Sequence, residues 1–142
     1  MKHSVNKKRF THSLFLNQTP ETDFKLSKLE VPVVLLVTSY PPRECGIATY
    51  SQDLIAALGQ QFDHSFELQV CALKSEHSDH TYPEEVTYRL RTDIPAAYAA
   101  QAHQINQDKR IGIVMIQHEF GLFRCEDEQR VLKFIQLLEK PV

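Results

Sequence analysis

Val33-Val34-Leu35-Leu36-Val37 is a continuous apolar run that is rich in β-branched side chains. Such a run is typical of a strand that is buried on both faces, as the strands of a parallel sheet are. Prolines at positions 41 and 42 end it, because proline has no N–H to donate to a strand ladder. Residues 111–117 form a second run of the same kind. The two runs together predict a sheet that is covered on both faces.

Strand and helix patterns alternate along the rest of the chain. Two further strands are expected at residues 66–73 and 86–90, the second of them near a sheet edge because its polar and apolar residues alternate. The spacing of apolar residues predicts helices at 46–59, 94–107 and 126–139. This order predicts an α/β fold: a Rossmann-like, doubly wound, mostly parallel sheet with helices on both faces, joined by right-handed crossovers.

Helix ends and helix faces can also be predicted. Gly59 is expected at the end of the first helix as a cap, and Asp93 before the second, where Pro95 occupies the first turn. The buried face of the third helix is expected to comprise Val131, Leu132, Ile135 and Leu138.

The chain divides into a tail and one domain. Residues 1–30 are polar and lack sustained periodicity, which predicts a flexible N-terminal tail. Its basic cluster is interpreted as solvated, with attraction to a membrane surface as the minority interpretation. Residues 31–142 are expected to form an incomplete Rossmann-like domain, because Pro141-Val142 resembles the approach to a fifth strand.

Composition narrows the functional class. The net charge of −2 gives no reason to expect nucleic acid as a partner. The longest apolar run is too short to span a bilayer, and the N-terminus lacks the apolar segment of a signal peptide. Three cysteines, without a close pair, argue against a disulfide framework and favour a cytoplasmic location.

The first candidate site is the loop at residues 38–50, which runs from a buried strand into a helix N-terminus. Free backbone N–H groups and the helix dipole favour an anion there, typically a phosphate. Gly46 would allow a ligand to approach the backbone, and Arg43 would add a charged contact. The alternative is that Gly46 and the two prolines only shape a tight turn. Cys45 is interpreted as a loop residue and Cys71 as part of the core.

The second candidate site is the stretch at residues 117–123, where polar groups follow the apolar strand abruptly. His118 and Glu119 at a strand end suit binding or proton transfer. The alternative is that neighbours in an extended segment point to opposite sides and do not cooperate. No metal site is expected, since His77 and His80 lie in a polar loop without a third ligand nearby.

These two stretches carry a family resemblance. PRECGIATY at residues 42–50, followed by Asp53-Leu54, resembles the first loop and helix of retaining, family-four glycosyltransferases of the GT-B fold. QHEFGLF at residues 117–123 resembles the loop after the fourth strand of these enzymes, although Arg124-Cys125 follow here where family members commonly have a Gly-Gly pair. The resemblance covers residues 33–142.

The resemblance implies two Rossmann-like domains that face a cleft, with the acceptor held mainly by the N-terminal domain and the nucleotide-sugar donor by the C-terminal one. It implies neither a metal nor a cofactor besides the donor substrate itself. The implied donor-phosphate residues are Arg43, Gly46, Ile47 and Thr49, and those of the acceptor-side loop are His118, Glu119 and Gly121. No catalytic residue is assigned.

Three functional hypotheses follow. In the first, the chain is the N-terminal part of a glycosyltransferase and is inactive alone, because the donor-binding domain is not within its 142 residues. In the second, it is a stand-alone module that binds a nucleotide or phosphate. In the third, it is the interaction subunit of a split enzyme, whose unfinished sheet edge pairs with a partner chain that supplies the C-terminal domain.

Overall fold

A computed structural model describes residues 31–62, 65–75, 81–119, 121–123 and 129–142. The predicted N-terminal tail lies outside the described residues.

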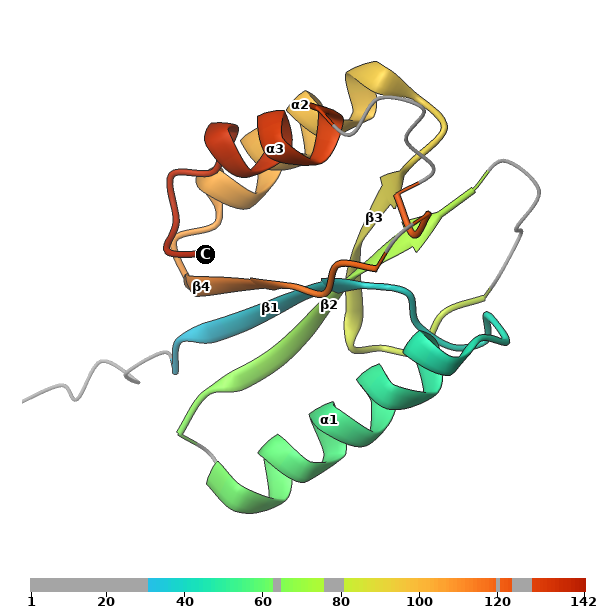
Figure 1. The fold of residues 1–142 in the computed structure, drawn as a ribbon. Helices are drawn as coiled ribbons and strands as arrows, with labels where there is room; N and C mark the ends of the chain where they lie inside the picture. The colour runs from blue at the N-terminus through green and yellow to red at the C-terminus, as the bar shows by residue number, and fades with distance from the viewer. Residues whose placement is uncertain (1–30, 63–64, 76–80, 120, 124–128) are drawn as a thin grey trace, which may run out of the picture.

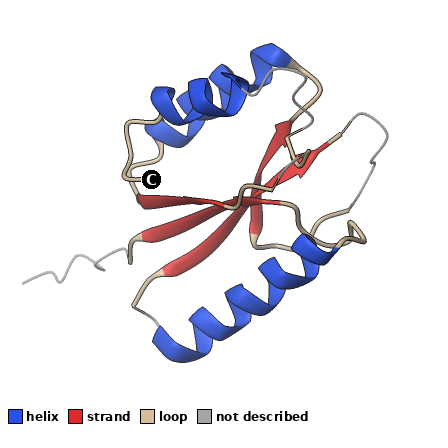
Figure 2. Ribbon diagram, in the orientation of Figure 1, coloured by secondary structure: helices blue, strands red, loops and turns tan. Residues whose placement is uncertain are grey.

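The centre of the protein is a four-stranded, all-parallel sheet (Figure 2). The strands are β1 (Val33–Thr38), β2 (Glu67–Lys74), β3 (Val86–Arg91) and β4 (Ile111–Ile116). Their order across the sheet is β3-β2-β1-β4, so the chain builds outward on one side of β1 and then crosses to the other. The two apolar runs are therefore neighbours, and the predicted edge position of the third strand is confirmed.

In the described part of the chain, three helices cover the two faces of this sheet (Figure 1). They are α1 (Gly46–Phe62) on one face, and α2 (Pro95–Gln107) and α3 (Gln129–Leu137) side by side on the other. The predicted α/β, Rossmann-like arrangement is confirmed. It follows from strands that are apolar on both faces and need helices on both.

The hydrophobic core has two parts, one on each face of the sheet. On the face of α2 and α3, Tyr98 and Phe134 are buried, and their rings meet edge to face with centroids 6.2 Å apart. The Tyr98 hydroxyl donates to the carbonyl of Phe123 over 3.0 Å, which satisfies its one polar group inside the core. On the face of α1, a smaller cluster surrounds Tyr40 and Val70. Cys71 is buried in the larger part, as predicted.

Some predicted helix ends were wrong. α1 continues past Gly59 to Phe62, because favourable neighbours carry the helix through a single glycine. α2 has Ile94 at its N-cap with no side-chain cap, and Asp93 instead pairs with Arg91 on β3, with 2.6 Å between carboxylate and guanidinium. Pro95 does open α2, as predicted.

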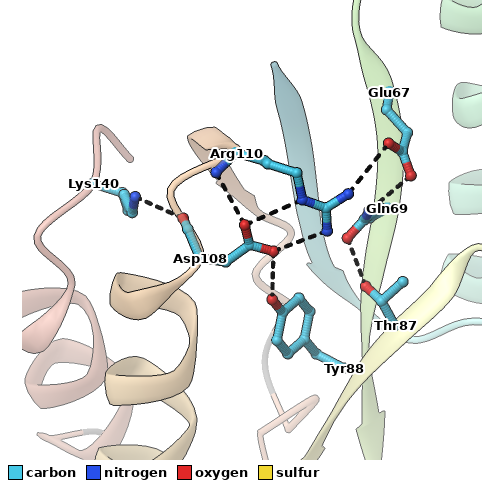
Figure 3. Close-up of polar contacts among 7 residues, drawn as sticks. All are labelled: Glu67, Gln69, Thr87, Tyr88, Asp108, Arg110 and Lys140. Atoms are coloured by element: carbon cyan, nitrogen blue, oxygen red, sulfur yellow. Dashed lines mark hydrogen bonds and ion pairs between the residues drawn. The ribbon is translucent and has the colours of Figure 1, made fainter. Parts of the chain in front are cut away.

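A polar network ties the amino ends of the strands together, opposite the rim where ligands bind in such sheets (Figure 3). Asp108, just after α2, accepts hydrogen bonds from the backbone and guanidinium of Arg110 and, over 3.0 Å, from the hydroxyl of Tyr88 on β3. Arg110 also lies 3.8 Å from the carboxylate of Glu67, at the start of β2. The network joins α2 to three strands.

Candidate functional site

A crevice is expected where β1 and β4 lie side by side. The chain leaves the carboxyl end of β1 toward α1 on one face and passes from β4 to α3 on the other (Figure 1). Loops that diverge from adjacent parallel strands leave a crevice between them, and in open α/β sheets ligands bind at such switch points.

The structure has a hollow of about 390 Å³ at this place. α1 contributes Ile47, Tyr50 and Leu54 to its lining. Met115 at the end of β4, with Gln117 and His118 just after it, forms the other side. The two stretches singled out in the sequence thus meet around one space.

Buried hydroxyl groups hold the carboxyl end of β4 against α1. The side-chain oxygen of Gln117 accepts hydrogen bonds from Thr38 at the end of β1 and from Ser51 on α1, each over 2.5 Å. Both hydroxyl residues are fully buried. None of the described residues accepts a hydrogen bond from the amide nitrogen of Gln117. That nitrogen is therefore the group through which Gln117 can bind a ligand in the hollow.

The loop after β4 folds into a tight turn that presents His118. The His118 ring stacks on Phe123, with centroids 5.8 Å apart and planes 16° from parallel. Gly121 has a φ of 82°, a conformation that side chains rarely adopt, and Leu122 N–H donates to the Glu119 carbonyl. Glu119 is exposed and does not line the hollow. Only the histidine of the predicted pair contributes to the lining.

The N-terminus of α1 holds a thiol. Partial burial raises the pKa of Cys45, but hydrogen bonds from the Ser39 hydroxyl and the N–H groups of Ala48 and Ile47, with the nearby charge of Arg43, lower this pKa below its ordinary value overall. The N–H groups predicted to hold a phosphate thus face a sulfur atom of the protein itself.

The other predicted residues differ in their surroundings. Gly46 begins α1, and a Cβ atom built there would meet nothing within 4 Å, so the protein's own packing does not require glycine at that position. Thr49 is exposed, and its backbone N–H donates to the Cys45 carbonyl. Arg43 lies half-buried in the turn after β1. Of the seven predicted site residues, Ile47 and His118 line the hollow.

Sequence reasoning missed several residues of this site. Tyr50 and Leu54 share helical spacing with Ile47, and that spacing predicted the helix without assigning either residue to a site. Tyr50 is 60% exposed. No strand lies beyond β4 in the described residues, so this side of α1 faces open space. The position of Ser51 could have been predicted from the sequence, because it follows Ile47 by four positions and therefore lies on the same face of the helix.

No family model, curated protein or solved structure matches the chain. Among the described residues, no group of three or more side chains is arranged to hold a metal ion, and His77 and His80 lie outside them. None of the helices in the described part of the chain is long and apolar enough to cross a membrane.

Proposed function

We propose that this chain is the acceptor-side domain of a nucleotide-sugar-dependent glycosyltransferase with a GT-B-like architecture, and that the hollow between α1 and β4 binds the sugar acceptor. The observation that carries the proposal is the meeting of the two resembling stretches around one hollow at the switch point of the sheet. Neither stretch alone would support it.

The lining suits a neutral ring that carries hydroxyl groups. Tyr50 and His118 offer flat aromatic faces on which a sugar ring can stack. The amide nitrogen of Gln117 can donate to a sugar hydroxyl, and its carbonyl oxygen is already held by two hydroxyls. A few polar groups in an apolar hollow are what a small-molecule site needs for orientation.

The same lining does not suit a diphosphate. No lysine or arginine is among the residues that line the hollow, and a leaving diphosphate needs cationic or dipolar stabilisation. We therefore expect sugar binding without sugar transfer from the purified 142-residue chain. Released UDP or GDP, measured after mixing with UDP- or GDP-sugars and an acceptor sugar, checks this expectation.

The binding test is an NMR titration of the folded protein with methyl glycosides of common hexoses. Saturable amide shifts are expected at Ile47, Tyr50 and His118. Tyr50→Ala should weaken the affinity roughly two- to tenfold, since stacking on an aromatic ring contributes about 0.5–1.5 kcal/mol. Phe62→Ala, an exposed aromatic at the far end of α1, is the matched control and should leave the affinity unchanged. Equal losses in both variants, or no saturable shift with any glycoside, would contradict the proposal.

The stand-alone phosphate- or nucleotide-binding module is the alternative, favoured by Arg43 near the N-terminus of α1. Gly46→Ala and Gly59→Ala form a matched pair, because both glycines are exposed on α1 with open space around the added Cβ. If phosphate binds against Gly46, only Gly46→Ala should weaken binding of inorganic phosphate and UDP. Sugar binding unaffected by both variants would favour the acceptor site.

A further inference from the structure

Thr38, Ser51 and Gln117 form a buried polar cluster where β1, α1 and the end of β4 meet. Thr38 and Ser51 have no exposed surface, and their hydroxyl oxygens lie 2.7 Å apart. Each hydroxyl also lies 2.5 Å from the side-chain oxygen of Gln117. Gln117 is the member of the cluster that lines the hollow beside α1, so the two hydroxyls act on a ligand there through the Gln117 amide.

The two hydroxyl groups have more hydrogen-bond partners than hydrogens. Each hydroxyl can donate one hydrogen bond. Besides Gln117, the Ser51 hydroxyl has the Ile47 carbonyl as an acceptor at 2.7 Å, and the Thr38 hydroxyl has the Ser39 carbonyl at 3.2 Å. When both hydroxyls donate to Gln117, their own oxygens face each other at 2.7 Å without a hydrogen between them. A second arrangement of the hydrogens therefore competes with this one.

In the second arrangement the Gln117 amide is turned over. The amide nitrogen and oxygen exchange places by rotation about one bond, and the two forms have nearly the same shape. Ser51 then donates to the Ile47 carbonyl and Thr38 to the Ser39 carbonyl, while both hydroxyl oxygens accept hydrogen bonds from the amide nitrogen. In this form each hydroxyl and amide hydrogen of the cluster has an acceptor, and the amide oxygen of Gln117 faces the hollow.

Both arrangements keep the buried hydroxyls paired, so neither carries the cost of an isolated buried polar group. A buried hydroxyl without a partner destabilises a protein. Threonine and serine avoid this cost in both arrangements, because a hydroxyl can donate or accept. An apolar side chain at position 38 or 51 could do neither, and a side chain that only donates would hold the amide in one orientation.

We propose that Thr38 and Ser51 are positioning residues that support the Gln117 amide in two orientations, and that the hollow therefore binds a ligand hydroxyl group either as a hydrogen-bond acceptor or as a donor. With its nitrogen toward the hollow, Gln117 donates to the hydroxyl oxygen. With its oxygen there, it accepts the hydroxyl hydrogen. Sugar hydroxyls have both capacities. The identity of the ligand rests on the proposed function, whereas the two orientations are a property of the protein alone.

The first test needs no ligand. Solvent exchange of the Gln117 side-chain amide hydrogens, measured by NMR with isotope-labelled glutamine, reports whether the nitrogen contacts the buried hydroxyls. Ser51→Ala and Thr38→Val each remove one acceptor and should speed this exchange at least roughly twofold, because the nitrogen then faces solvent for a larger share of the time. Gln52→Ala, at an exposed position beside Ser51 on α1, is the control and should leave the exchange unchanged. Unchanged exchange in both hydroxyl variants would mean that the nitrogen always faces the hollow, and would overturn the inference.

The second test asks whether the same hydroxyls also donate. Gln117→Glu introduces a carboxyl group that only accepts hydrogen bonds when it is ionised. Removing one donor with Ser51→Ala in that background should raise the pKa of the introduced carboxyl group, measured by NMR titration. An unchanged pKa would show that Ser51 does not donate, which also overturns the inference.

Glycoside binding tests the positioning role. Ser51→Ala should weaken the binding of a methyl hexoside roughly two- to tenfold, because the amide loses one of the hydrogen bonds that hold it, and Gln52→Ala should not weaken it. Equal affinity of the unaltered chain and Ser51→Ala would refute the positioning role. If no glycoside binds the unaltered chain, the proposed function fails, and the exchange and pKa measurements still decide between one orientation and two.

Discussion

Cys45 and Cys71 have identical side chains, but their positions in the fold give their thiols different pKa values and different reactivity. Cys45 lies half-buried at the start of α1, where hydrogen-bond donors face its sulfur. Cys71 lies in the middle of β2 with no exposed surface, and burial raises its pKa to about 12. Since the thiolate is the reactive form, only the first is set up to react.

We predict that iodoacetamide labels Cys45 at neutral pH faster than a cysteine in an unfolded peptide, while Cys71 stays unlabelled in the folded protein. Ser39→Ala removes one donor to the Cys45 sulfur. It should slow labelling and move the midpoint of the rate–pH curve upward. Chymotryptic digestion and tandem mass spectrometry, which separate the two cysteines, measure both rates. Similar labelling of Cys45 and Cys71 would show that the assigned surroundings are wrong.

At the scale of elements, hydrogen bonds from a few polar side chains hold the turn between a helix and the next strand. The Asp108 carboxylate fixes the turn between α2 and β4 through Arg110, and it reaches β3 through Tyr88 (Figure 3). Partial burial raises the pKa of Asp108, but hydrogen bonds from Arg110 and Tyr88 and the charge of Arg110 lower it below its ordinary value overall. Burial, together with the hydrogen bond to Asp108 and the negative charge of that carboxylate, raises the pKa of Tyr88 to about 12, while the charge of Arg110 opposes the rise.

The lowered pKa of Asp108 predicts how the free energy of unfolding changes with pH. A carboxyl group whose pKa is lowered in the folded state stabilises the fold above its unfolded pKa, and that contribution is lost as the pH falls through the lowered value. Asp108→Asn should therefore cost about 1 kcal/mol at pH 7, and the difference from the unaltered chain should shrink below a pH of roughly 4. Urea unfolding across this pH range measures it. Asp53→Asn, on the exposed side of α1, is the control. A difference that persists undiminished at pH 3 would contradict the prediction.

At the scale of the whole molecule, the sheet separates a large core from a small one, and α3 belongs to the large core. Phe134 is fully buried against Tyr98. Leu132, expected on the same buried face of α3, is 59% exposed. It lines a second hollow, between α3 and β4, where no described element covers it.

Truncation of Phe134 should lower the free energy of unfolding much more than truncation of Leu132. Phe134→Ala should cost about 3–5 kcal/mol, because it leaves a cavity in the large core. Leu132→Ala should change stability by less than about 0.5 kcal/mol, as exposed positions usually do. Thermal and urea unfolding of both variants gives the comparison. A large loss in Leu132→Ala would mean that this side chain is covered in solution.

The sequence by itself determined the fold class and the main elements. Apolar runs at residues 33–37 and 111–117 indicate strands buried on both faces, and alternating helix patterns indicate the layers. The edge position of β3 and the burial of Cys71 were also predictable. These features depend on the burial of each segment, which hydrophobic periodicity records locally.

Only the tertiary structure decided which segments meet. Thr38 and Gln117 are 79 positions apart, and they form one hydrogen bond because β4 packs beside β1. The exposure of Tyr50 and Leu132 depends on the position of β4 at the edge of the described sheet, which no local pattern encodes. Periodicity reports that a side chain is apolar, whereas strand order and helix rotation depend on contacts between distant segments. The fold class was therefore predictable, and the hollow that carries the proposed function was not.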